Sequence, residues 1–230
     1  MIREMTRLVP ALLLILLSLA APAPLAAQTT AGAYPAFAPR AFVMFSQQQF
    51  AAKETFEAIF GESTGSFRGG GVDVVIARNI FAEIGFARFE QTGERVFPCV
   101  PAVPPPGSEV KCPFRLGIPL TAKIRSVEFV AGYRVTAWRR VLPYGGIGVG
   151  SHRYQESSEF AAAGDDVSVS ASGLVLAGGV EVRLARFIGV TVDVRRSTIE
   201  EIIGSGGISK EFGENDLGGT AARFRIIIGR

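Results

Sequence analysis

Residues 179–196, GVEVRLARFIGVTVDVRR, decide the fold of this chain. Val180 and Val182 alternate with Glu181 and Arg183, and the same alternation resumes after a two-residue turn. Successive side chains of a β-strand point to opposite faces of the sheet, so each of these strands has an apolar and a charged face. The stretch therefore predicts a β-hairpin whose two faces differ in polarity.

The same alternation recurs along most of the chain, in segments of about ten residues bounded by turn residues. We expect eight strands, of which the first, over about 41–52, has the weakest pattern because residues 42–45 (FVMF) do not alternate. The apolar residues of the other seven are Val72, Val74 and Ile76; Ile80, Ala82, Ile84 and Phe86; Val127, Phe129, Ala131, Tyr133 and Val135; Ile147 and Val149; Leu174, Leu176, Val180 and Val182; Ile188, Val190, Val192 and Val194; and Ala222, Phe224, Ile226 and Ile228.

The connections between these strands are alternately short and long. An up-and-down barrel of the bacterial outer membrane has this arrangement, with tight periplasmic turns and long extracellular loops. We therefore predict an all-β fold, an eight-stranded antiparallel up-and-down transmembrane β-barrel. The short connections are 78–79, 137–142 and 185–186; the long ones are 53–65, with a helical turn over 53–60, and 91–119, 155–166 and 201–215.

The second face of the strands carries balanced charges. A soluble lipocalin-like barrel would turn these charges to water around an apolar ligand cavity, whereas a membrane barrel would enclose them. The interior of an eight-stranded barrel is only wide enough for side chains. The chain also has 20 Arg and 4 Lys, and Lys is the usual residue of a solvated surface. We favour the membrane orientation, with the periplasmic lipocalin-like barrel as the alternative, and expect a luminal charge network of Asp73, Glu83, Glu128, Arg134, Glu181, Arg183, Asp193, Arg195, Arg223 and Arg225.

Five arginines lie on the same face of the strands as the apolar residues. Each lies at the end of that apolar series from which a long loop begins or ends. Guanidinium groups bind phosphates in a bidentate manner, so these side chains are candidates for contacts with lipopolysaccharide phosphates. Ion pairs with loop acids such as Glu90 or Glu156 are the equal alternative. The five residues are Arg68, Arg88, Arg125, Arg153 and Arg196.

The N-terminal segment has the pattern of a secretory leader. Arg3 and Arg7 precede an apolar run over 8–20, which is too short to cross a bilayer as a helix, and small residues follow through Ala27. We expect a cleaved signal peptide over 1–27, a short periplasmic segment over 28–40 and the barrel over 41–230.

Two cysteines, Cys99 and Cys112, flank the proline-rich stretch 100–110. In an oxidising compartment such a pair closes a loop with a disulfide, so we expect one structural disulfide in the long loop over 91–119.

Three stretches resemble one known group, the small outer-membrane barrels of the OmpA/OmpX-like superfamily. They are the glycine-rich strand 143–150 (PYGGIGVG), the hairpin over 178–195 and the closing strand over 218–228. The resemblance covers about 41–230. It implies an integral protein of the cell outer membrane, surrounded by lipid and lipopolysaccharide and inserted by the barrel-assembly machinery. One departure is the C-terminus, because such barrels usually end in an aromatic residue and this chain ends Ile228-Gly229-Arg230.

The sequence offers little for chemistry. The net charge of +3 does not suggest nucleic acid, and the single histidine, His152, leaves too few ligands for zinc. Ser151 precedes His152, so the two side chains point to opposite faces and cannot pair; we expect His152 to hydrogen bond within the lumen. We predict no catalytic residue, cofactor or metal. The expected function is that of a monomeric, non-enzymatic barrel for envelope integrity or surface contact through its loops, with a lipid A-modifying barrel enzyme as a further alternative.

Overall fold

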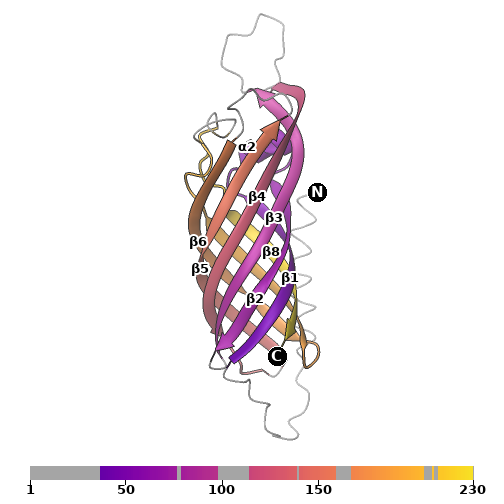
Figure 1. The fold of residues 1–230 in the computed structure, drawn as a ribbon, viewed down its shortest axis with the longest axis vertical. Coiled ribbons are helices and arrows are strands. Elements are labelled where there is room, and N and C mark those ends of the chain that lie inside the picture. The colour runs from indigo at the N-terminus through magenta and orange to yellow at the C-terminus, as the bar shows by residue number, and fades with distance from the viewer. Residues whose placement is uncertain are drawn as a thin grey trace, which may run out of the picture. The chain divides into compact units, whose positions relative to one another are not determined.

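The computed structural model describes residues 37–76, 79–97, 114–138, 140–158, 167–204, 209 and 212–229. In this part of the chain, eight antiparallel strands follow one another around a closed barrel (Figure 1). The predicted eight-stranded up-and-down barrel is confirmed. The strands are β1 (Phe37–Phe50), β2 (Thr64–Ile76), β3 (Ile80–Phe97), β4 (Phe114–Arg134), β5 (Val141–Ser158), β6 (Val167–Arg183), β7 (Ile188–Thr198) and β8 (Gly219–Gly229).

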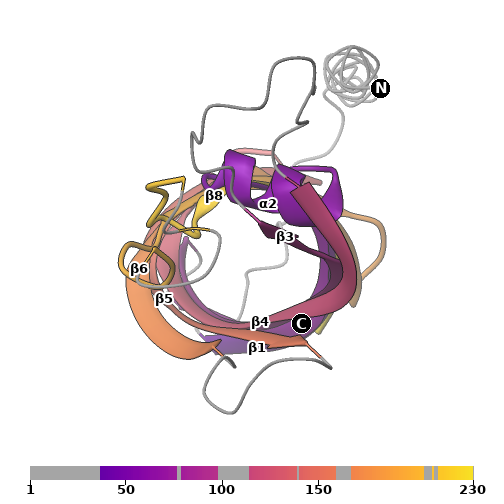
Figure 2. The same cartoon turned by 90° about the horizontal axis from the view of Figure 1, so that it is seen from above.

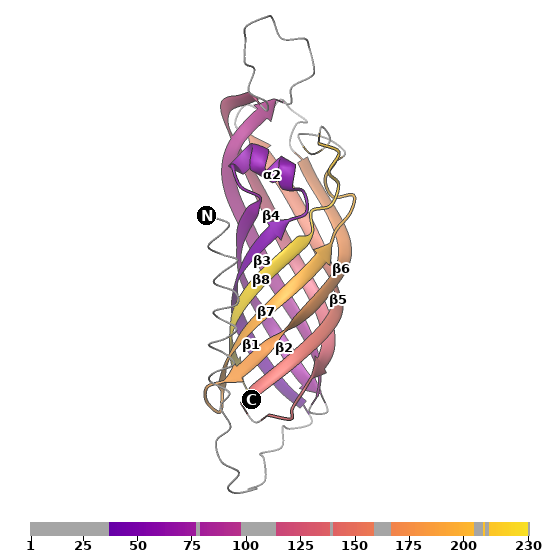
Figure 3. The same ribbon diagram turned by 180° about the vertical axis from the view of Figure 1, so that it is seen from behind.

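The first and last strands pair with each other and close the barrel. Figure 3 shows β1 and β8 side by side. Their register runs from Arg40 opposite Gly229 to Phe50 opposite Gly219. Gly219 has a φ of 136°, and a Cβ atom at this position would lie 2.0 Å from the carbonyl oxygen of Gln49. This point of the closing pair therefore requires glycine.

The two faces of the barrel wall are oriented as a membrane barrel requires. Large apolar side chains are exposed on the outside, including Val72, Phe129 and Ile226, and the charged residues of the alternate positions are buried inside. Val192 shares the outward parity of Ile226, so neither residue lines a cavity. This orientation is opposite to that of a lipocalin-like carrier. No helix in the described residues is long and apolar enough to cross a membrane.

Helix α2 (Lys53–Phe60) lies at the loop end of the barrel, as the sequence predicted (Figure 2). The ring of Phe56, a residue of this helix, stacks on the ring of Phe50, with 3.7 Å between the ring centroids. Inward-pointing side chains of the upper strands, among them Phe67 and Phe89, complete this apolar cluster. We call the whole cluster the apolar plug; its buried members are Phe50, Ala52, Phe56, Phe67, Phe89, Ala122, Ile124, Tyr154, Ile199, Ile202, Ile203 and Leu217.

Strand β1 begins at Phe37, before the expected start at Ala41, and thereby includes Arg40. Phe42 and Met44 point into the lumen and Val43 points outward. Both faces of this strand are apolar here, which explains why the sequence does not alternate.

The expected loop over 91–119 is wrong in extent, because β3 and β4 continue as a paired ribbon to Phe97 and Phe114. The pairing of β2 with β3 ends at Arg68 and Arg88, and that of β4 with β5 ends at Leu120. The ribbon therefore extends beyond both neighbouring strands (Figure 1). Strand β5 likewise reaches Ser158, inside the expected loop over 155–166. The expected signal peptide over 1–27 and the cysteines Cys99 and Cys112 lie outside the described residues.

Candidate functional site

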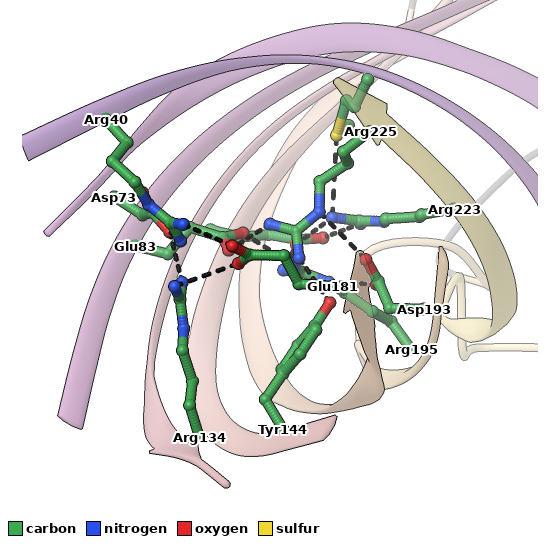
Figure 4. Close-up of polar contacts among 12 residues, drawn as sticks. Arg40, Asp73, Glu83, Arg134, Tyr144, Glu181, Asp193, Arg195, Arg223 and Arg225 are labelled. Atoms are coloured by element: carbon green, nitrogen blue, oxygen red, sulfur yellow. Dashed lines mark hydrogen bonds and ion pairs between the residues drawn. The ribbon is translucent and has the colours of Figure 1, made fainter. Parts of the chain in front are cut away.

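The candidate site has an inner part, which is the charge network of the lumen. Four of its residues form a closed ring of ion pairs between strands β1, β2, β4 and β6 (Figure 4). Arg40 donates to Asp73 (Nε to Oδ1, 2.9 Å) and to Glu181 (Nη1 to Oε1, 2.7 Å). Arg134 contacts the same two carboxylates, with 3.1 Å from its Nη1 to Glu181 Oε2. Two guanidiniums and two carboxylates make this quartet neutral.

A second group, with Arg195 at its centre, lies on strands β3, β4, β7 and β8. Arg195 donates to Glu83, Glu128 and Asp193 at 2.5, 2.9 and 3.1 Å. Arg225 forms ion pairs with Glu83 (2.5 Å) and Asp193 (3.0 Å).

Arg223 and Tyr144 complete this group. Arg223 donates to Glu128 with both Nη atoms, at 2.8 and 2.7 Å, and the hydroxyl of Tyr144 on β5 accepts a hydrogen bond from Arg225. Three guanidiniums and three carboxylates make this sextet neutral as well.

Burial explains why the charges are so closely matched. Side chains of the ten residues are at most 6% exposed, and an unpaired ion in such surroundings would cost several kcal/mol. Nine of the ten residues expected from the sequence lie in these two groups, together with Arg40, which was not predicted. Arg183 is the exception: its side chain is 29% exposed, and its Nε lies 4.0 Å from Glu181.

His152 faces the lumen and hydrogen bonds there, as expected. Its Nδ1 lies 2.8 Å from the Oγ of Ser126, which is directly opposite on β4. Both side chains are buried, whereas Ser151 points outward. Ser126 could not be predicted as a partner from the sequence, because only strand register identifies cross-strand partners. The described residues contain no group of His, Cys, Asp or Glu arranged to hold a metal ion.

The extracellular end forms the outer part of the site. Glu214, from the segment before β8, accepts hydrogen bonds from the backbone N–H of Glu54 (3.1 Å) and of Thr55 (2.8 Å). A carboxylate at this position satisfies free N–H groups of the helix N-terminus. Glu214 thus holds α2 in place over the barrel. A cavity of about 310 Å³ opens beside the helix, lined by Glu54, Glu57, Ala58, Arg115 and Phe212.

Four of the five outward arginines lie on adjacent strands at the loop end. The register places Arg68 opposite Arg88, Arg88 opposite Arg125, and Arg125 opposite Arg153. Arg196 lies apart on β7, opposite Leu176 and Thr220. The expected loop acid Glu90 pairs with Arg88, while Glu156 accepts a hydrogen bond from Tyr154 at 3.1 Å.

Comparison with solved structures supports the same fold. Neisserial surface protein A (NspA) is 11% identical, with a TM-score of 0.51, and the match covers 84% of this chain and 97% of that protein. The outer membrane protein OprG from Pseudomonas aeruginosa is 12% identical, with a TM-score of 0.51 and coverage of 88% and 99%. No curated protein matches the sequence.

The sequence itself matches the family model described as "Outer membrane protein beta-barrel domain" over residues 11–225. This match spans nearly all of the described barrel, and it agrees with the closed eight-stranded architecture and the outward apolar face. The chain belongs to the outer membrane protein beta-barrel domain family.

Proposed function

We propose that this outer-membrane barrel is non-enzymatic and acts in surface contact through the β3–β4 hairpin. The observation that carries the proposal is the projection of this hairpin: among the described residues, β3 and β4 pair only with each other beyond Leu120, up to Phe97 and Phe114. Long extracellular loops on a rigid scaffold are where binding residues concentrate.

The base of the hairpin is held rigidly. Val96 of β3 and Leu120 of β4 pack with Ala58 and Ile59 of α2 in a buried cluster. The helix is in turn held by Glu214. The described part of the hairpin is therefore braced from one side by the helix.

The filling of the lumen favours a function outside the barrel. The part of the lumen nearer the short turns contains the two neutral ion-pair groups, and the part at the loop end contains the apolar plug. Side chains thus occupy both levels, as expected for a barrel of eight strands. Such a barrel serves as a membrane anchor for its extracellular parts.

A deletion of residues 100–110 tests the proposal while retaining both expected disulfide partners, Cys99 and Cys112. Cells that express this variant should bind less to collagen-, fibronectin- or polystyrene-coated surfaces than cells with the unaltered protein. The control is a deletion of residues 159–166, in the β5–β6 connection. This control deletion should leave binding unchanged. Heat-modifiable migration of both variants verifies folding. Unchanged binding after removal of 100–110 would disprove a role for the hairpin in surface contact.

The lipid A-modifying alternative has its own test at Ser126 and His152. A serine next to a histidine is a nucleophile–base arrangement, but both side chains are buried inside the barrel. Mass spectra of lipid A from cells expressing the unaltered chain and His152→Ala should be identical. A mass difference that disappears in the variant would establish an enzyme instead.

A further inference from the structure

Four arginines form one continuous row across the outside of β2, β3, β4 and β5. Each directly faces the next in the strand register, in the order Arg68, Arg88, Arg125 and Arg153. All four side chains point outward and are exposed. The row could not be recognised from parity alone, because parity gives the face of a strand but not its register with the neighbouring strand.

This arrangement is electrostatically unfavourable on its own. Directly opposite side chains have Cβ atoms about 4.5–5.5 Å apart, and like charges there are destabilising. The carboxylate of Glu90 pairs with Arg88, but it also pairs with Lys123 at 3.2 Å. Within the described residues, neither Arg68 nor Arg125 has a carboxylate partner. The row together with Lys123 and Glu90 has five positive charges and one negative, a net charge of +4.

The row also marks the change from apolar to polar on the outer face. The next outward positions on the side of the short turns are apolar: Phe86 and Val127 are 53% and 44% exposed. The next outward positions on the side of the long loops are polar, as at Lys123 and Gln155. An outward arginine is tolerated at the membrane interface and costs about 2–4 kcal/mol at the midplane. The row therefore lies at the level of the lipid headgroups.

The row is oblique. Strands in such barrels tilt by about 35–45° and lie about 4.8 Å apart, so each arginine is about 3 Å higher or lower than its neighbour. Four guanidiniums are thus spread over a height of about 9 Å. A ligand with several phosphates at different depths matches this spread better than a single small anion.

We infer that the row is a binding site for a phosphorylated lipid of the outer leaflet, with the phosphates of lipopolysaccharide held by the guanidiniums. Its acyl chains would lie on the exposed apolar surface that includes Phe86 and Val127. Arg196 is excluded from this site, because it lies on β7 opposite Leu176 and Thr220 and faces no other arginine. The site therefore occupies one side of the barrel and does not encircle it. It is independent of the role proposed for the β3–β4 hairpin.

Arg196 provides a matched control for the experiment, since it is outward and basic but outside the row. The purified barrel in detergent is titrated with lipid A that carries both phosphates, and bound lipid is counted by native mass spectrometry. Arg125→Gln should weaken binding about fivefold, and Arg88→Gln with Arg125→Gln about 25-fold, since a basic residue near an anionic surface contributes about 1 kcal/mol. Arg196→Gln should change binding less than twofold.

Two further measurements distinguish the lipid source and a structural role. Enzymatically dephosphorylated lipid A and phosphatidylglycerol should bind the unaltered barrel more weakly than phosphorylated lipid A. In detergent without lipopolysaccharide, Arg125→Gln should unfold at the same or a higher temperature, because a like-charge contact is removed. Equal weakening by Arg196→Gln, equal binding of dephosphorylated lipid A or of phosphatidylglycerol, or a lower unfolding temperature for Arg125→Gln would overturn the assignment.

Discussion

Arg40 and Glu181 are 141 positions apart in the sequence, and their side chains form an ion pair of 2.7 Å inside the barrel. They come from β1 and β6, which are not neighbours in the sheet. The pair therefore spans the lumen (Figure 4). The charged side chains thus connect strands that do not pair with each other in the sheet.

Replacing Arg40 with Met should lower the free energy of unfolding by about 3–5 kcal/mol, because it leaves Asp73 and Glu181 short of one partner in a buried place. Guanidinium unfolding in detergent micelles, followed by tryptophan fluorescence, measures the change. Arg183→Met is the control, and it should cost less than about 1 kcal/mol, as for a partly exposed pair. Equal losses of unfolding free energy in the two variants would contradict the role of Arg40 in the buried ion-pair network.

The membrane orientation can be tested at Phe129, which is exposed in the middle of the outward apolar face. Phe129→Arg should destabilise the barrel in lipid vesicles by about 2–4 kcal/mol, the range measured for arginine at the bilayer midplane. Phe129→Leu should have a much smaller effect. The comparison of unfolding curves decides the matter: if arginine is tolerated as well as leucine, this face does not contact hydrocarbon.

Gly148 of β5 should be intolerant of even a methyl group. A Cβ atom there would lie 1.9 Å from the carbonyl oxygen of Phe129 on the adjacent strand, whereas at Gly85 the nearest atom, on Phe42, would be 3.7 Å away. Gly148→Ala should therefore cost about 1–3 kcal/mol or prevent folding, as overpacking does. Gly85→Ala should fold normally, with unaltered heat-modifiable migration. Normal stability of Gly148→Ala would show that the strands are further apart here.

Opening the extracellular end should not make a channel. If residues 53–60 are replaced by a flexible glycine–serine segment, the apolar plug loses Phe56, but the two ion-pair groups still fill the lower lumen. In planar bilayers, both this variant and the unaltered barrel should show no steady conductance. Additional removal of Arg195 and Glu128 serves as the comparison, because it would empty part of the lower lumen. A stable open state with only α2 replaced would contradict the packed lumen.

The sequence predicted the fold well where one face of a strand is apolar and the other charged, as in β6 and β7. It was inaccurate where this contrast is absent. In β1, Phe42 and Met44 face inward beside outward apolar residues, so the strand start was placed too late and Arg40 was missed. In the hairpin, both faces near Gln91 and Glu94 are polar, and the paired ribbon was expected to be a loop.

Contacts between distant segments were also beyond prediction. The stacking of Phe56 on Phe50 and the hydrogen bonds from α2 to Glu214 join parts of the chain that no local pattern relates. The arginine row is similar, since the faces of Arg88 and Arg125 were predicted but their direct opposition depends on register. The Ser126–His152 contact depends on register in the same way.

The reach of the charge network has a consequence for biogenesis. A sheet that has inserted only its first strands would place Arg40 next to hydrocarbon without Glu181, which arrives with β6. A partly inserted intermediate thus carries uncompensated ions, and the penalty disappears only once the later strands are in place. We therefore expect entry into the bilayer and sealing of the cylinder to be coupled in a single cooperative event.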